Sequence, residues 1–139
     1  MKSFTKALIA LFTISIFTSC NELADKPIIN PTITLTQGEG ECSLLLSDNE
    51  LTKTYGNNLV TWECGSGVSE IVDIYFKSGD NVFQVGPRKK NPNNPNSDWF
   101  GITKNTQNKL EEQYGIKWKD SEGNTCDHDP TIKVEPNEN

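Results

Sequence analysis

The sequence predicts an all-β fold, a small antiparallel β-sandwich of seven to eight short strands. Apolar residues alternate with polar ones in five runs, at residues 32–36, 59–64, 72–77, 114–119 and 131–135. Such period-two alternation places one face of a strand on a core and the other in water. Glycine and asparagine, which tolerate tight turns, stand between these runs. Short strands separated by such turns about every 8 to 12 residues are typical of sandwiches and barrels.

The inward positions of these runs define the expected core. Between two of the runs, the segment KSGDNVF carries a Gly-Asp-Asn turn, which predicts a hairpin between residues 70–77 and residues 82–86. Residues 105–113 are polar and predict at most a short helical turn. The expected core residues are Trp62, Val72, Ile74, Phe76, Ile116, Trp118, Ile132 and Val134.

The first 20 residues have the charge order of a secretory signal peptide. Lys2 and Lys6 precede an apolar stretch at residues 7–17. This stretch is shorter than the roughly 18 residues that a membrane-spanning helix needs. Two small residues, Thr18 and Ser19, then stand directly before Cys20.

Residues 17–20 resemble the lipobox of bacterial lipoproteins. The resemblance implies that diacylglycerol is attached to the thiol of Cys20, that the signal is cut before it, and that the new amino group is acylated. Phe17 departs from the family pattern, in which Leu is usual. Asn21, where Asp would favour the inner membrane, implies an outer-membrane location. A plain signal peptide, or an uncut anchor, stays open as the alternative.

Cleavage before Cys20 would leave one domain of about 120 residues. We expect residues 20–30 to form a tether, residues 31–135 the sandwich and residues 136–139 a polar tail. All 19 acidic residues but only 11 of the 13 basic ones follow the cleavage point, so the mature net charge is −8. Such a surface disfavours nucleic acid and anionic headgroups as general partners.

The segment EEQYGIKW, residues 111–118, resembles the sixth strand of immunoglobulin-like sandwiches. That strand opens with a Tyr two residues before a core position, and Tyr114 and Ile116 match this spacing. Trp62 would then correspond to the core tryptophan of the third strand. Ile116 stands where antibody-type domains have Cys, so the resemblance implies no disulfide between the sheets at this place.

Cys42, Cys64 and Cys126 would lie in an oxidising compartment, where one disulfide is expected and three pairings exist. If the strand from Cys42 runs antiparallel to the strand that ends at Cys64, these two residues lie side by side. An immunoglobulin-like strand order places Cys126 at the opposite end of the domain. Bridged Cα atoms must approach within about 7 Å, so we predict a bond between Cys42 and Cys64 and a free thiol at Cys126.

Trp99 and Phe100 are candidate binding residues, because they follow an Asn-Pro loop at residues 91–97. An aromatic platform beside such a loop could stack on a sugar ring or on a partner protein. Alternation sends the two rings to opposite faces, so at least one is expected to pack inward. The basic residues 88–90 are interpreted as part of a solvated loop.

Cysteine, histidine and carboxylates gather at residues 123–130, GNTCDHDP. In an extended strand, Cys126 and His128 share one face, and Asp127 and Asp129 share the other. A metal site or a Ca²⁺ loop that includes the preceding acidic residues competes here with a simple hairpin turn, which we favour. With a single histidine and no phosphate loop, paired-carboxylate or HExxH motif, neither an enzyme nor a metal or cofactor is expected.

The sequence therefore predicts an exported, membrane-anchored binding or accessory module of the bacterial envelope. Its partner would be a glycan or another envelope protein, and the lipid on Cys20 would attach it to the membrane. The alternative is a structural or inhibitory surface lipoprotein that has no small-molecule ligand.

Overall fold

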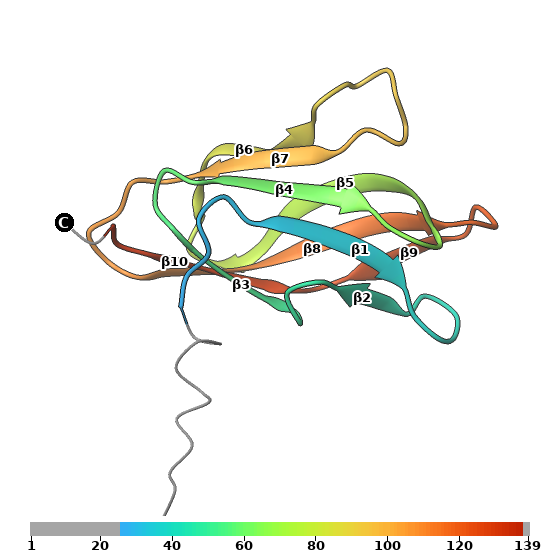
Figure 1. Ribbon diagram of the computed structural model, residues 1–139, viewed down its shortest axis with the longest axis horizontal. Helices are drawn as coiled ribbons and strands as arrows, with labels where there is room; N and C mark the ends of the chain where they lie inside the picture. The colour runs from blue at the N-terminus through green and yellow to red at the C-terminus, as the bar shows by residue number, and fades with distance from the viewer. Residues whose placement is uncertain (1–25, 138–139) are drawn as a thin grey trace, which may run out of the picture.

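The computed structural model describes residues 26–137, which form two β-sheets packed face to face (Figure 1). The predicted signal peptide and Cys20 lie outside the described residues. Within residues 26–137 no helix is long and apolar enough to cross a membrane. The ten strands are β1 (Thr32–Gln37), β2 (Leu44–Leu46), β3 (Leu51–Tyr55), β4 (Leu59–Cys64), β5 (Val68–Gly79), β6 (Phe83–Lys89), β7 (Trp99–Thr103), β8 (Leu110–Asp120), β9 (Thr125–His128) and β10 (Thr131–Glu135).

One sheet, the β4 sheet, has the order β2-β1-β4-β7-β6, and the other, the β8 sheet, has the order β3-β10-β8-β5 with β9 also paired to β8. The all-β sandwich prediction is confirmed. The structure differs in having ten strands and two parallel pairings, β1 with β4 and β3 with β10. The short strands β2 and β3 cause this difference, because they return the chain so that β4 runs in the same direction as β1.

The core lies between the two sheets, and Trp62, Tyr114 and Trp118 are its largest fully buried side chains. The indole Nε1 of Trp62 donates to the hydroxyl of Tyr114 at 3.2 Å, and the two rings meet edge to face. This contact satisfies a buried donor that would otherwise cost free energy. Two of the residues that carry the immunoglobulin-like resemblance therefore meet in the core.

Six of the eight expected core residues are buried, and the two exceptions lie in β5. Val72 is half-buried and Phe76 is 51 % exposed, whereas Ile71 is fully buried. The pairing of β5 with β8 shifts register between Ile71 and Asp73 and again after Phe76. Because a β-bulge inserts one residue, it reverses the face of the residues that follow. Strict alternation therefore fails within this strand.

The predicted hairpin between β5 and β6 is wrong, since β5 pairs with β8 and β6 pairs with β7. The segment between them crosses from one sheet to the other. The buried carboxylate of Glu112 accepts a hydrogen bond from Val82 N at 2.8 Å, and the carboxylate of Asp80 accepts one from Glu111 N at 3.0 Å. These side chains of β8 and of the crossover hold the connection in place.

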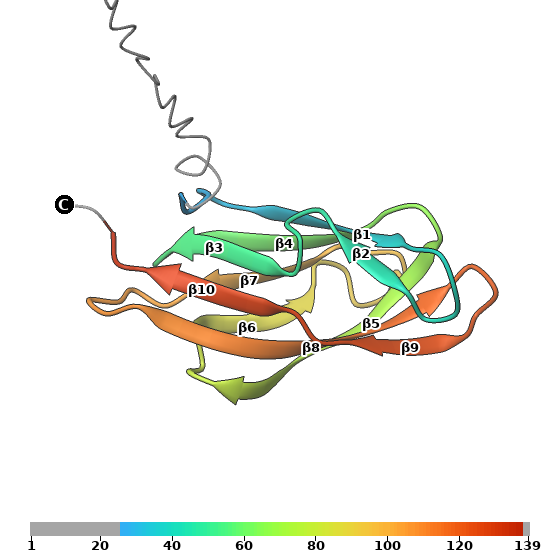
Figure 2. The same ribbon diagram turned by 90° about the horizontal axis from the view of Figure 1, so that it is seen from below.

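The disulfide joins Cys42 to Cys126, with their Cα atoms 5.3 Å apart, so the predicted bond between Cys42 and Cys64 is wrong. β4 runs parallel to β1, which places Cys64 opposite Leu35. Cys42 lies in the loop after β1, at the same end of the molecule as the β8–β9 turn (Figure 2). Cys64 is the free thiol of the described chain; it is half-buried, and burial raises its pKa.

The chain is already part of the domain before residue 31, where the sandwich was expected to begin. Ile28 N donates to Lys53 O at 2.8 Å, and Thr54 Oγ1 donates to Ile28 O at 2.7 Å, so this segment lies along β3. The side chain of Asn30 accepts a hydrogen bond from Leu59 N at 2.9 Å. The tether predicted for residues 20–30 is therefore shortened, because its last residues are bound to the sandwich.

Candidate functional site

The adjacent aromatic residues of β7 lie on opposite faces of the β4 sheet, as predicted. Trp99 is 7 % exposed, and its Nε1 donates to Ile71 O in the β8 sheet at 3.0 Å. Phe100 is half-buried on the outer face. Trp99 is therefore a core residue, and the candidate site is reduced to Phe100 and its neighbours.

Phe100 lies in a row of side chains that crosses the β4 sheet. The strand register places Thr61 of β4 on one side of Phe100 and Arg88 of β6 on the other. The guanidinium carbon of Arg88 is 5.1 Å from the centre of the Phe100 ring. This cation–π geometry keeps the guanidinium beside the ring and presents both to solvent.

The neighbouring row on the same face is apolar. Leu59, Ile102 and Val85 are opposite one another in register across β4, β7 and β6. Leu59 is 41 % exposed, and the other two are half-buried. We name the two rows together the Phe100 face; its members are Leu59, Thr61, Val85, Arg88, Phe100 and Ile102.

The basic residues 88–90 were interpreted as a solvated loop, and the structure corrects this for two of them. Arg88 and Lys89 belong to β6. The ammonium of Lys89 lies 2.8 Å from a carboxylate oxygen of Glu70, and that of Lys90 lies 3.2 Å from Asp98. Arg88, held over Phe100, is the member of this group that faces a candidate ligand.

The asparagine-rich loop projects from the end of β6 and the start of β7 (Figure 1), and Phe100 is the second residue of β7. Its shape is set locally, because the side-chain oxygens of Asn91 and Asn94 each accept a hydrogen bond from the backbone N–H two residues ahead. Ser97 Oγ also accepts a hydrogen bond from Asn91 N at 2.8 Å. The asparagines themselves remain exposed, so this loop offers several amide groups at the rim of the face.

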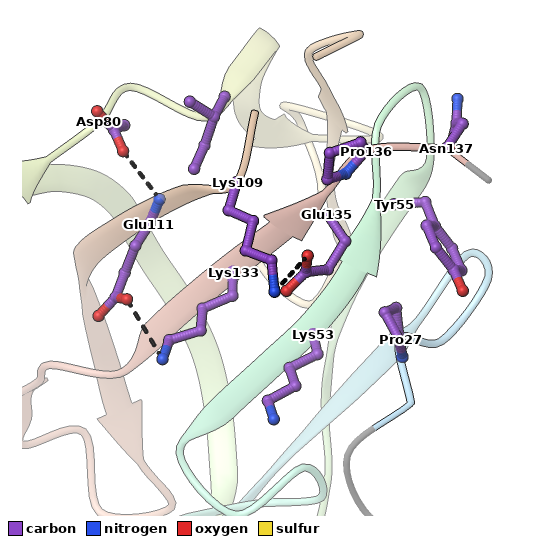
Figure 3. Close-up of a pocket in the computed structure, with 11 residues that line it drawn as sticks. Pro27, Lys53, Tyr55, Asp80, Lys109, Glu111, Lys133, Glu135, Pro136 and Asn137 are labelled. Carbon is purple, nitrogen blue, oxygen red and sulfur yellow. Dashed lines mark hydrogen bonds and ion pairs between the residues drawn. The ribbon is translucent and has the colours of Figure 1, made fainter. Parts of the chain in front are cut away.

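A second surface is an open hollow of about 730 Å³ on the outer face of the β8 sheet (Figure 3). Lys53 and Lys133 lie opposite each other in the parallel pairing of β3 with β10. Lys133 forms an ion pair with Glu111 at 3.3 Å, and Lys109 forms one with Glu135 at 3.2 Å. The carboxylates offset the lysines, so the hollow lacks the excess of positive charge that an anion site requires.

The cluster of cysteine, histidine and carboxylates forms neither a metal site nor a catalytic pair. β9 is extended as expected, but Cys126 is consumed by the disulfide and His128 contacts Glu50. Asp127 accepts a hydrogen bond from Tyr75, and Asp129 pairs with Lys77 at 2.6 Å. Among residues 26–137 no group of three or more histidine, cysteine or acidic residues has the geometry to hold a metal ion.

The acidic turn before β9 is the hairpin turn that the sequence favours over a Ca²⁺ loop. Asp120 accepts hydrogen bonds from Glu122 N, Asn124 N and the side-chain amide of Asn124, at 2.8 to 2.9 Å. These bonds favour the ionised carboxylate and lower the pKa of Asp120. The carboxylate oxygens of Asp120 therefore accept the hydrogen bonds that stabilise the turn.

Comparison with known proteins gives no match for this arrangement. No protein-family model matches the chain, and neither a curated protein nor a solved structure is significantly similar to it.

Proposed function

We propose that the chain is an exported bacterial lipoprotein, anchored through acylated Cys20, whose domain binds an envelope glycan on the Phe100 face. The anchoring part rests on the sequence pattern of residues 1–20. The binding part rests on one observation, the half-exposed ring of Phe100 with the guanidinium of Arg88 held 5.1 Å from its centre.

The chemistry of this pair suits a sugar. A pyranose ring has an apolar face of C–H groups, which packs on an aromatic side chain, and hydroxyl groups at its rim, which accept hydrogen bonds from a guanidinium. The exposed asparagines of the adjacent loop add polar groups near the ring, whereas the neighbouring Thr61 is buried. The Phe100 face lies on the open outer side of a sheet, which fits an extended chain of sugars better than an enclosed small molecule.

An envelope protein is the second candidate partner, and the apolar row of the Phe100 face favours it. Leu59, Ile102 and Val85 expose apolar surface next to Phe100. Apolar and aromatic residues at the centre with arginine nearby are typical of protein interfaces. The binding experiment below distinguishes the two partners.

The binding proposal is tested by co-sedimentation of the purified domain with insoluble peptidoglycan and by titration with soluble oligosaccharides. We expect Phe100→Ala to weaken binding at least tenfold. Phe76→Ala is the matched control, because Phe76 is 51 % exposed on the other sheet and should leave binding unchanged. Equal affinity of the two variants would contradict the proposed site, and saccharide-independent capture of an envelope protein would favour the second partner.

The anchoring proposal is tested by mass spectrometry of the mature N-terminal peptide from bacterial membranes. We expect the peptide to begin at Cys20 and to carry acyl groups. Cys20→Ala should remove the lipid and release the protein from the membrane fraction. An unmodified N-terminus at another residue, or an intact signal segment, would contradict this part of the proposal.

A further inference from the structure

Two apolar side chains are exposed to solvent at the start of the described chain. Ile28 is 54 % exposed and Ile29 is 70 % exposed. Their backbone is fixed, because Ile28 is hydrogen-bonded to β3 at both its N–H and its carbonyl group and Asn30 is bonded to Leu59. Single exposed apolar residues are common on proteins, but these two are adjacent on a fixed backbone and together present apolar surface to a partner.

Basic and aromatic residues surround these two isoleucines. Lys26, Pro27 and Tyr55 line one hollow of about 420 Å³ together with Ile29. Lys26 and Lys53 line a second one, of about 360 Å³, together with Ile28 and Asp48. Burial raises the pKa of Asp48 above its ordinary value. We name this surface the tether end; its members are Lys26, Pro27, Ile28, Ile29 and Tyr55.

The loop after β1 and the β8–β9 turn lie at the opposite end of the sandwich (Figure 2), and the side chains there are acidic. Glu41, Asp120 and Glu122 line a hollow of about 400 Å³ that contains no basic residue. Charges separated by more than about 8 Å are largely screened at physiological salt. The local charge of each end therefore matters more than the negative net charge of the whole chain.

The distance to the proposed anchor is short. Six Cα–Cα steps separate Cys20 from Lys26, and a fully extended chain spans at most about 3.6 Å per residue. The lipid on Cys20 would thus keep Lys26 within roughly 22 Å of its own attachment point. At this range the local concentration of the lipid surface is high, so a weak affinity of the tether end for that surface is sufficient.

We propose that the tether end docks on the membrane surface, with the two isoleucines and Tyr55 at the level of the headgroups and Lys26 at an anionic phosphate. Apolar, aromatic and lysine side chains together are the composition of segments that lie in the membrane interface. This inference rests on the proposed lipidation of Cys20. Docking would direct the acidic end, with its disulfide, away from the membrane.

The test attaches the chain from Cys20 to Asn139 to vesicles through a maleimide lipid. Cys64→Ser leaves Cys20 as the reactive thiol, since Cys42 and Cys126 are bonded to each other. Ile29→Trp reports contact at the tether end, Glu122→Trp is the matched reporter at the acidic end, and the native tryptophans are at most 7 % exposed. Lipids with a spin label near the headgroup quench a tryptophan that approaches them.

On vesicles that contain phosphatidylglycerol, we expect at least twofold quenching of the Ile29→Trp reporter and none of the Glu122→Trp reporter. Adding Lys26→Glu should reduce the quenching at residue 29. Equal quenching of the two reporters, or none at residue 29, would overturn the docking. Because the anchor is supplied chemically, this result is independent of cellular lipidation, which the mass of the N-terminal peptide reports separately.

Discussion

The two ends of the sandwich are held together by different chemistry. At the acidic end, a covalent bond between Cys42 and Cys126 fixes the loop after β1 to β9. At the tether end, hydrogen bonds hold the N-terminal segment, and the carboxylate of Glu112 holds the crossover between the sheets. The comparison teaches that reductant should act on the acidic end, whereas Glu112 should make the tether end sensitive to a rise in pH, although both belong to one domain.

Loss of the disulfide has the largest expected effect on this comparison. The bond closes a loop with a sequence separation of 84 residues, worth about 4.5 kcal/mol in the chain-entropy model. We expect Cys42→Ser to lower the free energy of unfolding in urea by about 4 kcal/mol, as should reduction of the wild type.

Cys64→Ser is the matched control for that experiment, because its thiol is half-buried and unbonded to another sulfur. It should cost less than about 1 kcal/mol. A similar loss of stability in both variants would contradict the bond. So would a Cys64-containing disulfide in a non-reducing peptide map.

At the tether end, Glu112→Ala should cost about 1 to 3 kcal/mol, because Val82 N then loses its acceptor in a buried position. Burial raises the pKa of Glu112 in the folded state, so folding binds protons there. Its contribution to stability is present at low pH and is lost as pH rises from the ordinary value of 4.5 through the folded pKa.

Glu112→Gln separates the charge from the hydrogen bond, because its amide oxygen still accepts from Val82 N. We expect the free energy of unfolding of this variant to decline less than that of the wild type as pH rises above 4.5. Parallel pH profiles of the two proteins, measured by urea denaturation, would show that Glu112 is not the source of the dependence.

Among the three contacts tested, Thr54→Val should have the smallest effect, about 1 kcal/mol, because it removes the hydrogen bond to Ile28 O and the one accepted from the Asn58 side chain but keeps the buried volume. The change should be local: amide hydrogen exchange should accelerate at Ile28 and remain slow at the paired residues of β8. Uniform acceleration throughout the domain would show that the N-terminal segment is not a separate unit of opening.

Several strands were predicted correctly from the sequence, and others were missed for physical reasons. The alternating runs lie within β1, β4, β5, β8 and β10. β3 was missed because its inward residues are Thr52 and Thr54, which are buried with hydroxyls bonded to Asp48 and to Ile28 O. Because threonine is polar, a search for alternating hydropathy does not identify its side chains as buried and misses the strand.

The functional surfaces were only partly predictable. Opposite directions for Trp99 and Phe100 follow from the pleat of a strand, but which ring faces the core depends on packing across the sheets. The position of Arg88 over Phe100 depends on a β6–β7 register that contains bulges. To predict the disulfide, one must know the spatial order of strands that are not adjacent in sequence, because Cys42 and Cys126 are 84 residues apart.

The parallel pairing of β3 with β10 also has a consequence for the order of folding. β3 is complete at Tyr55, yet its sheet neighbour begins at Thr131, near the end of the chain. Contacts between such distant segments form late, because a long loop must close before they contribute. A sheet edge whose partner strand comes this late in the chain favours folding after both segments have been synthesised, which is compatible with the export proposed above.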